Sequence, residues 1–501
     1  MDGGGAAEHR RRLAAQRQAG GDRHSRALPR QRSFRVHDGI GDPGRRRHPV
    51  GNPPRYGCSS GRAALSCRGA RRRHRLFYNI ARRRRARRER AHQTGAGVAP
   101  ESGLRALIAD GAFRRLWLIG ATTGIMRWLD MVVTGIYVFD VTGSPTWVAI
   151  VTFARAAPMI VGVMFGALAA RMPLGRLMRV GIAAVALTYG SLAILAALDA
   201  LAVWHVTAGA LVIGTYWSSE NSVRRTMMCA VAGMANTGTA ISFDWATING
   251  LRLAGPFIGG VLYAAFGFGA TCVLGVACFA AALMLALGMS TGSVAALSGQ
   301  RRIWDDIAES FAVVRRSTTV QGVLAVSICL NFFGFPYGSM IPVIGKEVLH
   351  AAPADVGLLS STEGLGAMLG AIGLTAFVRP AWFGRAFLVG SFAVALGALG
   401  FGLSQAYALS LVALLPAGLG MSWFAAMQST QVLAHTPAER RSGIMGVLTT
   451  TIGLGQLGTL HIGWLASQIG AAEAVVVSAA CAVAALILCA WRWPAMWRDR
   501  G

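Results

Sequence analysis

Apolar stretches long enough to cross a lipid bilayer recur along the chain from Phe113 to its C-terminal end. A transmembrane α-helix needs about 20 consecutive, predominantly apolar residues. Because 53% of the residues are hydrophobic and only 14% are charged, the chain has too little polar surface to coat a soluble globule. The pattern therefore predicts an all-α polytopic membrane protein with twelve transmembrane helices. These lie at residues 113–138, 146–169, 177–198, 202–221, 238–264, 268–290, 319–345, 355–378, 384–403, 406–431, 443–468 and 473–493.

The first 100 residues are a different kind of sequence. They hold 26 arginines and 6 acidic residues, and so contribute +20 to the formal net charge of +27. Because apolar periodicity is absent, we expect residues 1–105 to be a disordered extension. Two interpretations stay open: a basic arm that binds anionic lipid headgroups or nucleic acid, or a translation start placed too early, since GC-rich DNA read out of frame yields such a composition. We expect no nucleic-acid partner.

Basic residues in the predicted connections follow a strict alternation. Nineteen arginines precede helix 1, lie in even-numbered connections or follow helix 12, whereas the odd-numbered connections contain only Lys346. Because basic residues collect in cytoplasmic loops, the pattern predicts a multi-pass protein of the plasma (inner) membrane with both termini in the cytoplasm. The nineteen are Arg105, Arg114, Arg115, Arg171, Arg176, Arg179, Arg224, Arg225, Arg301, Arg302, Arg315, Arg316, Arg379, Arg385, Arg440, Arg441, Arg492, Arg498 and Arg500.

The longest internal connection, residues 291–318, divides the predicted helices into two sets of six. It contains IWDDIAESFAVVRR, whose spacing predicts an amphipathic helix at the membrane surface. The segments after helices 2 and 8, GALAARMPLGRLMRVG and GLTAFVRPAWFGRAFLVG, are alike. We therefore expect an N-terminal half at 106–290, a linker at 291–318 and a C-terminal half at 319–501, the two-half architecture of secondary transporters.

Four segments together resemble the major facilitator superfamily, and within it the branch of drug and siderophore exporters. They are FRRLWL with VFDVTGSP around helix 1, ARAAP with GALAAR in and after helix 2, RLAGPFIGGVL in helix 5, and TPAERRSGIMG before helix 11. The resemblance covers roughly residues 110–495. It implies alternating access in a two-half fold and, through the glycine-rich helix 5 of exporters, favours efflux.

The connection after helix 2 departs from the pattern of the superfamily. Gly166, Arg171 and Arg176 match its G-x-L-x-D-R-x-G-R motif, but Ala170 stands at the acidic position. In the superfamily that acidic residue helps to hold the halves together in the outward-open state. The resemblance therefore implies a weaker latch here, or one built from other residues.

Ionisable residues within membrane helices are costly and are functional candidates by default. Arg127 and Asp130 are three residues apart in helix 1, which favours an ion pair. They are interpreted either as a structural pair or as a substrate or proton site, with Asp130 the better proton carrier. Arg155, at the family's ARAAP position, is a candidate counter-ion for Asp130 or Asp244.

Helix 5 combines two charges with small residues. Asp244 and Arg252 are eight residues apart and fall close to one face, beside the pairs Gly255–Pro256 and Gly259–Gly260. The small residues allow close helix approach and bending. They are candidates for a conformational motif, and the alternative is that they only pack helices.

Glu363 in helix 8 and Glu220 in helix 4 complete the acidic candidates. No basic residue flanks Glu363, so we expect either an unpaired carboxylate that titrates with a proton gradient or a protonated one held by a neighbouring Ser or Thr. Glu220 is expected to pair with Arg224, four residues on. Ten aromatic residues could line a cavity or form lipid-facing belts: Trp128, Trp147, Phe153, Trp217, Trp245, Phe332, Phe333, Phe335, Tyr337 and Trp423.

The motifs exclude several function classes. No GxxxxGK[ST] sequence for an ATPase occurs, and no nucleophile motif, metal-ligand spacing or disulfide framework stands in the sequence. We expect no enzyme, cofactor or metal, and a monomer suffices for the predicted activity. The hypothesis is proton-coupled efflux of small amphipathic compounds, of the drug, macrolide or siderophore class. The alternatives are an importer on the same fold and a non-transporting membrane receptor.

Overall fold

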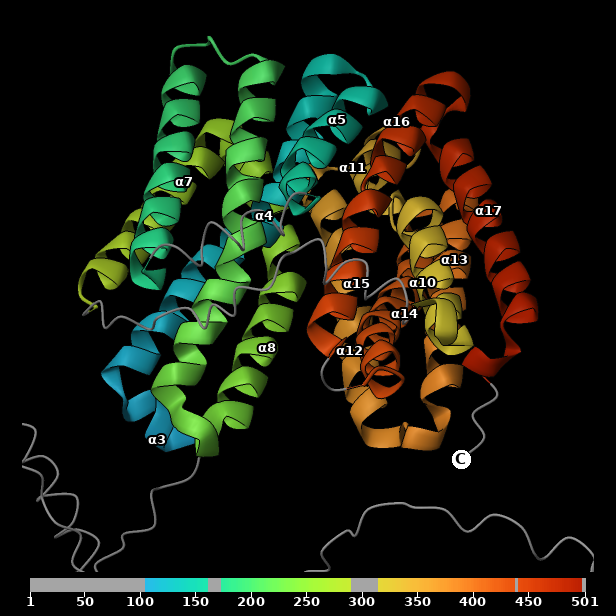
Figure 1. The fold of residues 1–501 in the computed structure, drawn as a ribbon. Helices are drawn as coiled ribbons and strands as arrows, with labels where there is room; N and C mark the ends of the chain where they lie inside the picture. Colours follow the sequence, from blue (N-terminus) through green and yellow to red (C-terminus); the bar gives the residue numbers. More distant parts are fainter. Residues whose placement is uncertain (1–103, 161–172, 290–313, 438–439, 498–501) are drawn as a thin grey trace, which may run out of the picture. The chain divides into compact units, whose positions relative to one another are not determined.

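The computed structural model describes residues 104–160, 173–289, 314–437 and 440–497, all within the second of the two units, 1–96 and 97–501, into which the chain divides. The described residues are helical throughout, without strands (Figure 1). The predicted extension up to residue 103 and residues 303–313 of the amphipathic linker helix lie outside them, whereas residues 104–105 and 314–316 are helical. The elements are α3 (Leu104–Ala109), α4 (Gly111–Thr142), α5 (Pro145–Ala156), η1 (Ala157–Met159), α7 (Leu174–Ala197), α8 (Val203–Leu287), α10 (Thr318–Cys329), η2 (Leu330–Gly334), α11 (Tyr337–Glu347), α12 (Pro353–Phe377), η3 (Pro380–Trp382), α13 (Phe383–Leu403), α14 (Tyr407–Ala434), α15 (Arg441–Gly455), α16 (Leu457–Ile469), α17 (Ala471–Arg492) and η5 (Pro494–Met496).

Local sequence sets the ends of α4. The Asp110 carboxylate accepts hydrogen bonds from the backbone N–H groups of Ala112 (2.7 Å) and Phe113 (3.0 Å), which caps the N-terminus. At the other end Gly143 takes a left-handed conformation, with φ of +58°, and its N–H bonds to the Phe139 carbonyl. Pro145 then opens α5, where a proline N–H is not needed. The chain therefore reverses between α4 and α5.

Helix α8 is 85 residues long, but it is not one rod. Gly233 and Gly267 have non-helical conformations, with φ of +73° and +74°. The side chains of Arg224 and Asp244 are in contact although a straight helix would separate them by about 30 Å, so the chain must fold back between them. Figure 1 accordingly draws α8 as separate helices side by side. The two breaks fall in or beside the connections predicted at 222–237 and 265–267.

The first of these connections is shorter than predicted. Helix 4 is predicted to end at residue 221, with Arg224 in the following loop, but the helix runs on to Gly233 and Arg224 is 1% exposed. The prediction was wrong because the polarity of a residue does not show which opposite charges lie beside it in the fold. Carboxylates from the same and the following helix neutralise the Arg224 guanidinium, which allows the helix to continue with the arginine buried.

Two predicted helices are interrupted near their middles. The segment predicted at 319–345 consists of α10, the π-helical turn η2 and α11, and the segment at 443–468 is divided between α15 and α16. The breaks pack against each other: a Cβ atom on Gly455 would lie 3.2 Å from the Asn331 Cα atom. Such interruptions leave backbone and side-chain polar groups facing the interior of a membrane protein.

The described helices are those of a multi-pass membrane protein. Nine stretches within the described ranges are long and apolar enough to span a bilayer. One of them, 52 residues long from Asn236 to Leu287, is broken at Gly267 and exceeds what a single crossing needs. The twelve predicted helices are compatible with this arrangement. Large apolar side chains also face outward, including Leu187 (75% exposed) and Trp491 (78% exposed), as lipid contact requires.

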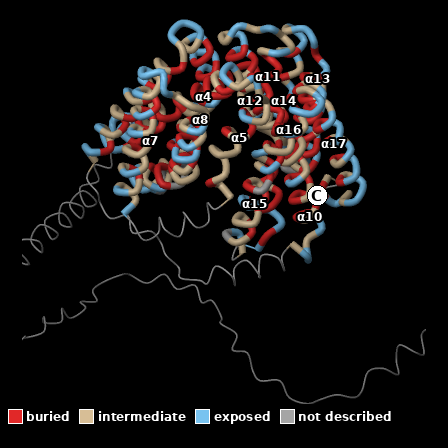
Figure 2. Tube along the Cα trace, turned by 90° about the horizontal axis from the view of Figure 1, so that it is seen from above, coloured by how far each residue is buried: buried red, intermediate tan, exposed pale blue. Residues whose placement is uncertain are grey.

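The helices form two groups that meet along a common interface. In the first helix group (α4 to α8), α4 and α7 pack on α8, and in the second helix group (α10 to α17), α13 packs on α14 and α17. The groups meet where α8 contacts α12 and where α5 contacts α16. Seen from above, exposed residues follow the outer sides of α7 and α17 and buried residues gather where helices face one another (Figure 2).

Candidate functional site

Two cavities lie between the helix groups. The larger cavity has a volume of about 720 Å³ and the smaller cavity about 330 Å³. Both take walls from α4 and α8 of the first group and from α12 and α14 of the second. They share the residues at which they approach each other, namely Trp128, Arg252, Met421 and Ala425. The larger volume matches that of drug-sized ligand sites.

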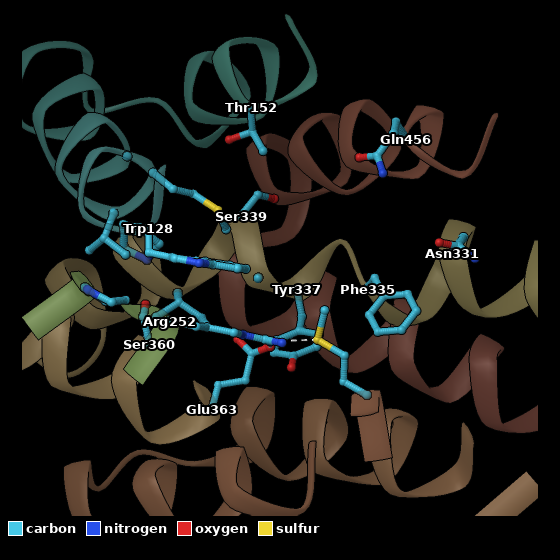
Figure 3. Close-up of a pocket in the computed structure, with 18 of the residues that line it drawn as sticks. Trp128, Thr152, Arg252, Asn331, Phe335, Tyr337, Ser339, Ser360, Glu363 and Gln456 are labelled. Atoms are coloured by element: carbon cyan, nitrogen blue, oxygen red, sulfur yellow. Dashed lines mark hydrogen bonds and ion pairs between the residues drawn. The ribbon is translucent and has the colours of Figure 1, made fainter. Parts of the chain in front are cut away.

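An ion pair between the groups stands where the two cavities approach. The Arg252 Nη2 atom on α8 lies 2.9 Å from the Glu363 Oε1 atom on α12, with the two side chains 13% and 15% exposed. The same Nη2 atom is 2.8 Å from the Met421 sulfur, and the guanidinium lies over the Trp128 ring at 5.1 Å from its centroid. Figure 3 shows Tyr337 beside this pair.

This arrangement corrects both expectations for Glu363. The carboxylate is neither unpaired nor held by a Ser or Thr, because Arg252 reaches it from the other helix group. The two residues are 111 positions apart, so spacing along one helix could not indicate the contact. Arg252 is likewise not paired with Asp244 on its own helix.

Asp130 and Arg155 form a second buried pair, inside the first group. The Arg155 Nη1 atom donates a hydrogen bond to the Asp130 carboxylate, and the Thr134 hydroxyl donates to the same carboxylate at 3.0 Å. Asp130 is 3% exposed. The expected pair of Arg127 with Asp130 does not form. Asp130 is turned toward α5, where Arg155 supplies the counter-ion, which is one of the two alternatives predicted for that arginine.

A third group of charges surrounds Arg224. Its guanidinium donates to Glu220, as the four-residue spacing predicts, and to Asp244 at 2.5 Å. Asp244 also accepts from the Arg225 Nε atom at 3.3 Å. The Arg225 guanidinium in turn lies 4.5 Å from the centroid of the Trp245 ring. Removing Arg224 would leave the buried Glu220 carboxylate without its partner.

Arg127 differs from the other arginines at the cavities. It lines the larger cavity, and its guanidinium stacks near Trp217 (5.2 Å to the ring centroid) and Trp128 (5.7 Å). Within the described part of the chain it has no hydrogen bond or ion pair. The Trp217 Nε1 atom is also buried without a hydrogen-bond partner there.

The small residues of helix 5 act in packing. A Cβ atom on Gly255 would lie 2.9 Å from the Trp128 Cβ atom, and one on Gly259 would lie 2.9 Å from the Leu129 Cγ atom, so both glycines bring α8 against α4. Gly260 faces α12 in the same way, 3.0 Å from the Ala354 Cα atom. Pro256 lines the smaller cavity. A part in the conformational change stays a prediction.

The conformational motif after helix 2 lies largely outside the described residues. Gly166 and Arg171 fall in the segment 161–172, outside the described residues. Arg176 is exposed in the first turn of α7, where its backbone N–H donates to the Pro173 carbonyl at 2.8 Å. No geometry of a latch follows from Arg176 alone.

Several polar residues of the cavities were not among the sequence candidates. Asn331 and Gln456 line the smaller cavity at the breaks of the two interrupted helices. Gln428, 3% exposed, donates to the Ser327 hydroxyl at 2.6 Å across α14 and α10. Uncharged amides give a weak signal in an apolar sequence, although their rarity within predicted membrane helices would have identified them. Trp128, Trp217, Trp245, Phe335 and Tyr337 are the predicted aromatic residues that line a cavity.

The contacts between helix groups at the end formed by the α4–α5 turn are polar and close. The Thr146 hydroxyl donates to the Gly463 carbonyl at 3.0 Å, and Lys346 Nζ lies 3.0 Å from the Asp140 carboxylate, which also accepts from the Tyr263 hydroxyl at 2.8 Å. Figure 1 shows α5 and α16 together at the top. The larger cavity takes its walls from the opposite ends of α4 and α12. Among the described residues no cluster of three or more His, Cys, Asp or Glu could hold a metal ion.

A membrane-embedded helical fold with cavities between two helix groups, and with an ion pair joining the groups at those cavities, defines a membrane transport protein. Comparison with known families agrees. A family model described as transmembrane secretion effector matches residues 102–499. The chain belongs to this family of the major facilitator superfamily.

Known relatives extend the comparison. The chain is 19% identical over 346 residues to the staphyloferrin A transporter of Staphylococcus aureus, covering 69% of this chain and 87% of that protein. Its fold resembles those of the nucleoside transporter NupG (TM-score 0.60, 14% identity, 77% of this chain and 99% of that one) and of a peptide transporter of the POT family (TM-score 0.63, 14% identity, 81% and 98%). These likenesses establish the fold, and the chain is a transporter of this class.

Proposed function

We propose that this protein exports small amphipathic compounds across the plasma (inner) membrane by proton-coupled alternating access. The observation that carries the proposal is the Arg252–Glu363 ion pair, which joins the two helix groups where the cavities approach each other. Secondary transporters of this architecture move one group against the other around a central site. A contact that both joins the groups and contains a titratable carboxylate is suited to couple that movement to a proton.

The coupling step follows from the charges. With Glu363 ionised, the pair attracts α8 to α12. Protonation of Glu363 removes that attraction, and Arg252 then keeps its contacts with the Trp128 ring and the Met421 sulfur. The groups can then separate at the pair, and release of the proton on the other side restores it. Asp130 and Asp244 each contact an arginine within the first group, so they are the second-choice carriers.

The orientation rests on the distribution of basic residues. Under the predicted topology, the end closed by Thr146–Gly463 and by Lys346–Asp140 faces outward, and the larger cavity lies toward the cytoplasm. A cavity on that side collects its substrate from the cell interior, as an exporter requires. The membership of the secretion effector family supports the same direction.

Export is tested with inverted membrane vesicles. Uptake of a panel of amphipathic compounds is measured with an imposed pH gradient, with and without a protonophore, for the native chain and for Glu363→Gln. We expect uptake that collapses with the protonophore and is lost or made independent of pH in Glu363→Gln, since glutamine cannot exchange a proton. Asp130→Asn and Asp244→Asn serve as matched carboxylate controls.

Each contrary result has a defined meaning. Accumulation in intact cells instead of inverted vesicles would establish an importer. Saturable binding without flux would establish a receptor. Normal, proton-dependent flux in Glu363→Gln would reject Glu363 as the coupling carboxylate. A loss of proton-dependent flux only in Asp130→Asn or only in Asp244→Asn would assign the coupling role to that carboxylate.

A further inference from the structure

The charges around the larger cavity do not balance. In the described residues four arginines meet there, Arg127, Arg224, Arg225 and Arg252, whereas the carboxylates in contact with them are three: Glu220, Asp244 and Glu363. Each of the last three arginines has its carboxylate within 3.3 Å or closer. The surplus positive charge therefore resides on Arg127.

Among the described residues no carboxylate forms an ion pair with Arg127. Glu220 attracts it electrostatically, but that carboxylate is already bonded to Arg224. Arg155, Arg225 and Arg252 lie near enough to repel it. Stacking near Trp128 and Trp217 attracts the guanidinium but provides no carboxylate and no hydrogen-bond acceptor for its N–H groups. An anion that enters the cavity would supply the partner that the Arg127 guanidinium lacks.

The walls around Arg127 indicate what kind of anion fits. Trp217 and Trp245 supply aromatic surface on the first group, and Ala367, Ala371 and Leu374 supply apolar surface on the second. The volume of about 720 Å³ far exceeds that of an inorganic ion. An apolar body with one acidic group would use both the rings and the guanidinium.

We propose that the larger cavity binds an amphipathic organic anion, with Arg127 holding its carboxylate and the tryptophans its aromatic or aliphatic body. The inference deepens the proposed function, since it rests on this cavity being the substrate site and names the charge of the substrate. The surplus positive charge of the cavity favours acidic compounds. It repels cationic amphipathic compounds, among them protonated macrolides. Arginine suits the task because its planar guanidinium forms paired hydrogen bonds with a carboxylate.

Binding is measured apart from transport. The purified full-length chain in lipid nanodiscs is titrated into fluorescein, an anion, and rhodamine 123, a cation with the same tricyclic ring system, and fluorescence anisotropy is recorded. We expect saturable binding of fluorescein and binding of rhodamine 123 that is at least tenfold weaker, since a charged hydrogen bond changes affinity by about that factor.

Three variants test the role of Arg127. Arg127→Gln is expected to weaken fluorescein binding about tenfold or more, and Arg127→Lys to weaken it less, because lysine keeps the charge but not the paired hydrogen bonds. Arg105→Gln removes an exposed arginine of α3 outside both cavities and is expected to change nothing. Equal binding of the two dyes, absence of saturable fluorescein binding, or unchanged affinity in Arg127→Gln would overturn the inference.

Flux measurements keep the two proposals distinguishable. Proton-driven uptake of rhodamine 123 but not of fluorescein into inverted vesicles would uphold the proposed function and reject the anionic substrate. Binding of fluorescein that depends on Arg127, without flux of any compound, would uphold the anion site and reject transport.

Discussion

At the scale of residues, the buried charges are organised as pairs between elements. Only the Glu220–Arg224 contact follows from spacing along one helix, and the sequence predicted it. The partner of Asp130 is 25 positions away and the partner of Glu363 is 111 positions away. Residue type identified these carboxylates because a charge in a membrane helix is costly. Arg155 was among the candidate counter-ions for Asp130, but the choice between candidates, and the partner of Glu363, depend on how helices pack, which a single sequence does not encode locally.

The Asp130–Arg155 pair gives a prediction on stability. Arg155→Met leaves Asp130, 3% exposed, as an uncompensated buried charge, and a loss of about 3–5 kcal/mol is expected. The double variant Asp130→Asn with Arg155→Met removes both charges and should recover much of that loss. Thermal unfolding in detergent, followed by tryptophan fluorescence, measures both. A double variant less stable than Arg155→Met would contradict the account.

At the scale of elements, long apolar stretches predicted the all-helical membrane fold, which the structure confirms, but not the interruptions of its helices. The π-helical turn η2 contains Asn331, and Gln456 follows α15, but each stretch is apolar enough overall to be predicted as one continuous helix. These breaks arise from contact between the two elements, with Gly455 and Gly458 admitting Asn331 and Phe332. Glycines at such positions are visible in the sequence, but their partners are not.

The α8–α12 interface predicts a difference between two glycines of one helix. A Cβ atom on Gly364 would lie 2.8 Å from the Arg252 carbonyl oxygen, whereas one on Gly373 meets nothing within 4 Å. Gly364→Ala is therefore expected to force the helices apart, lower stability by about 1–3 kcal/mol and disturb the Arg252–Glu363 pair. Gly373→Ala should be neutral in both thermal stability and flux. Equal effects of the two substitutions would contradict the tight contact.

At the scale of the whole molecule, the helix groups are closed by polar contacts at the α4–α5 end and leave the larger cavity between their opposite ends. The Lys346–Asp140 pair is 25% and 31% exposed and so contributes at most about 1 kcal/mol. A contact that weak holds a closed end without preventing its opening. The sequence predicted the two-half plan through internal similarity. The state that the halves occupy follows from contacts between distant residues and could not be predicted.

Because the Lys346–Asp140 pair is weak, we expect its removal to shift the equilibrium between the closed and the open α4–α5 end. Removing its charges with Lys346→Met should open the α4–α5 end more often, because one of the contacts that close it is lost. A spin-label distance between α5 and α16, read by double electron–electron resonance, is expected to gain a longer component. The native chain should have mainly the short distance. An unchanged distribution in Lys346→Met would assign closure to the Thr146–Gly463 contact and its surroundings alone.

The central claim, that transport requires the two helix groups to separate in turn at each end, is tested most directly by locking one end. Asp140 on α4 and Lys346 on α11 meet at the α4–α5 end, with their charged atoms 3.0 Å apart and both side chains partly exposed. In a chain whose other cysteines are replaced, Asp140→Cys with Lys346→Cys, joined by a bifunctional thiol reagent that contains a cleavable disulfide, should lose flux and regain it when a reductant cleaves the bridge, while each single variant stays active. Full flux through the cross-linked protein would contradict alternating access.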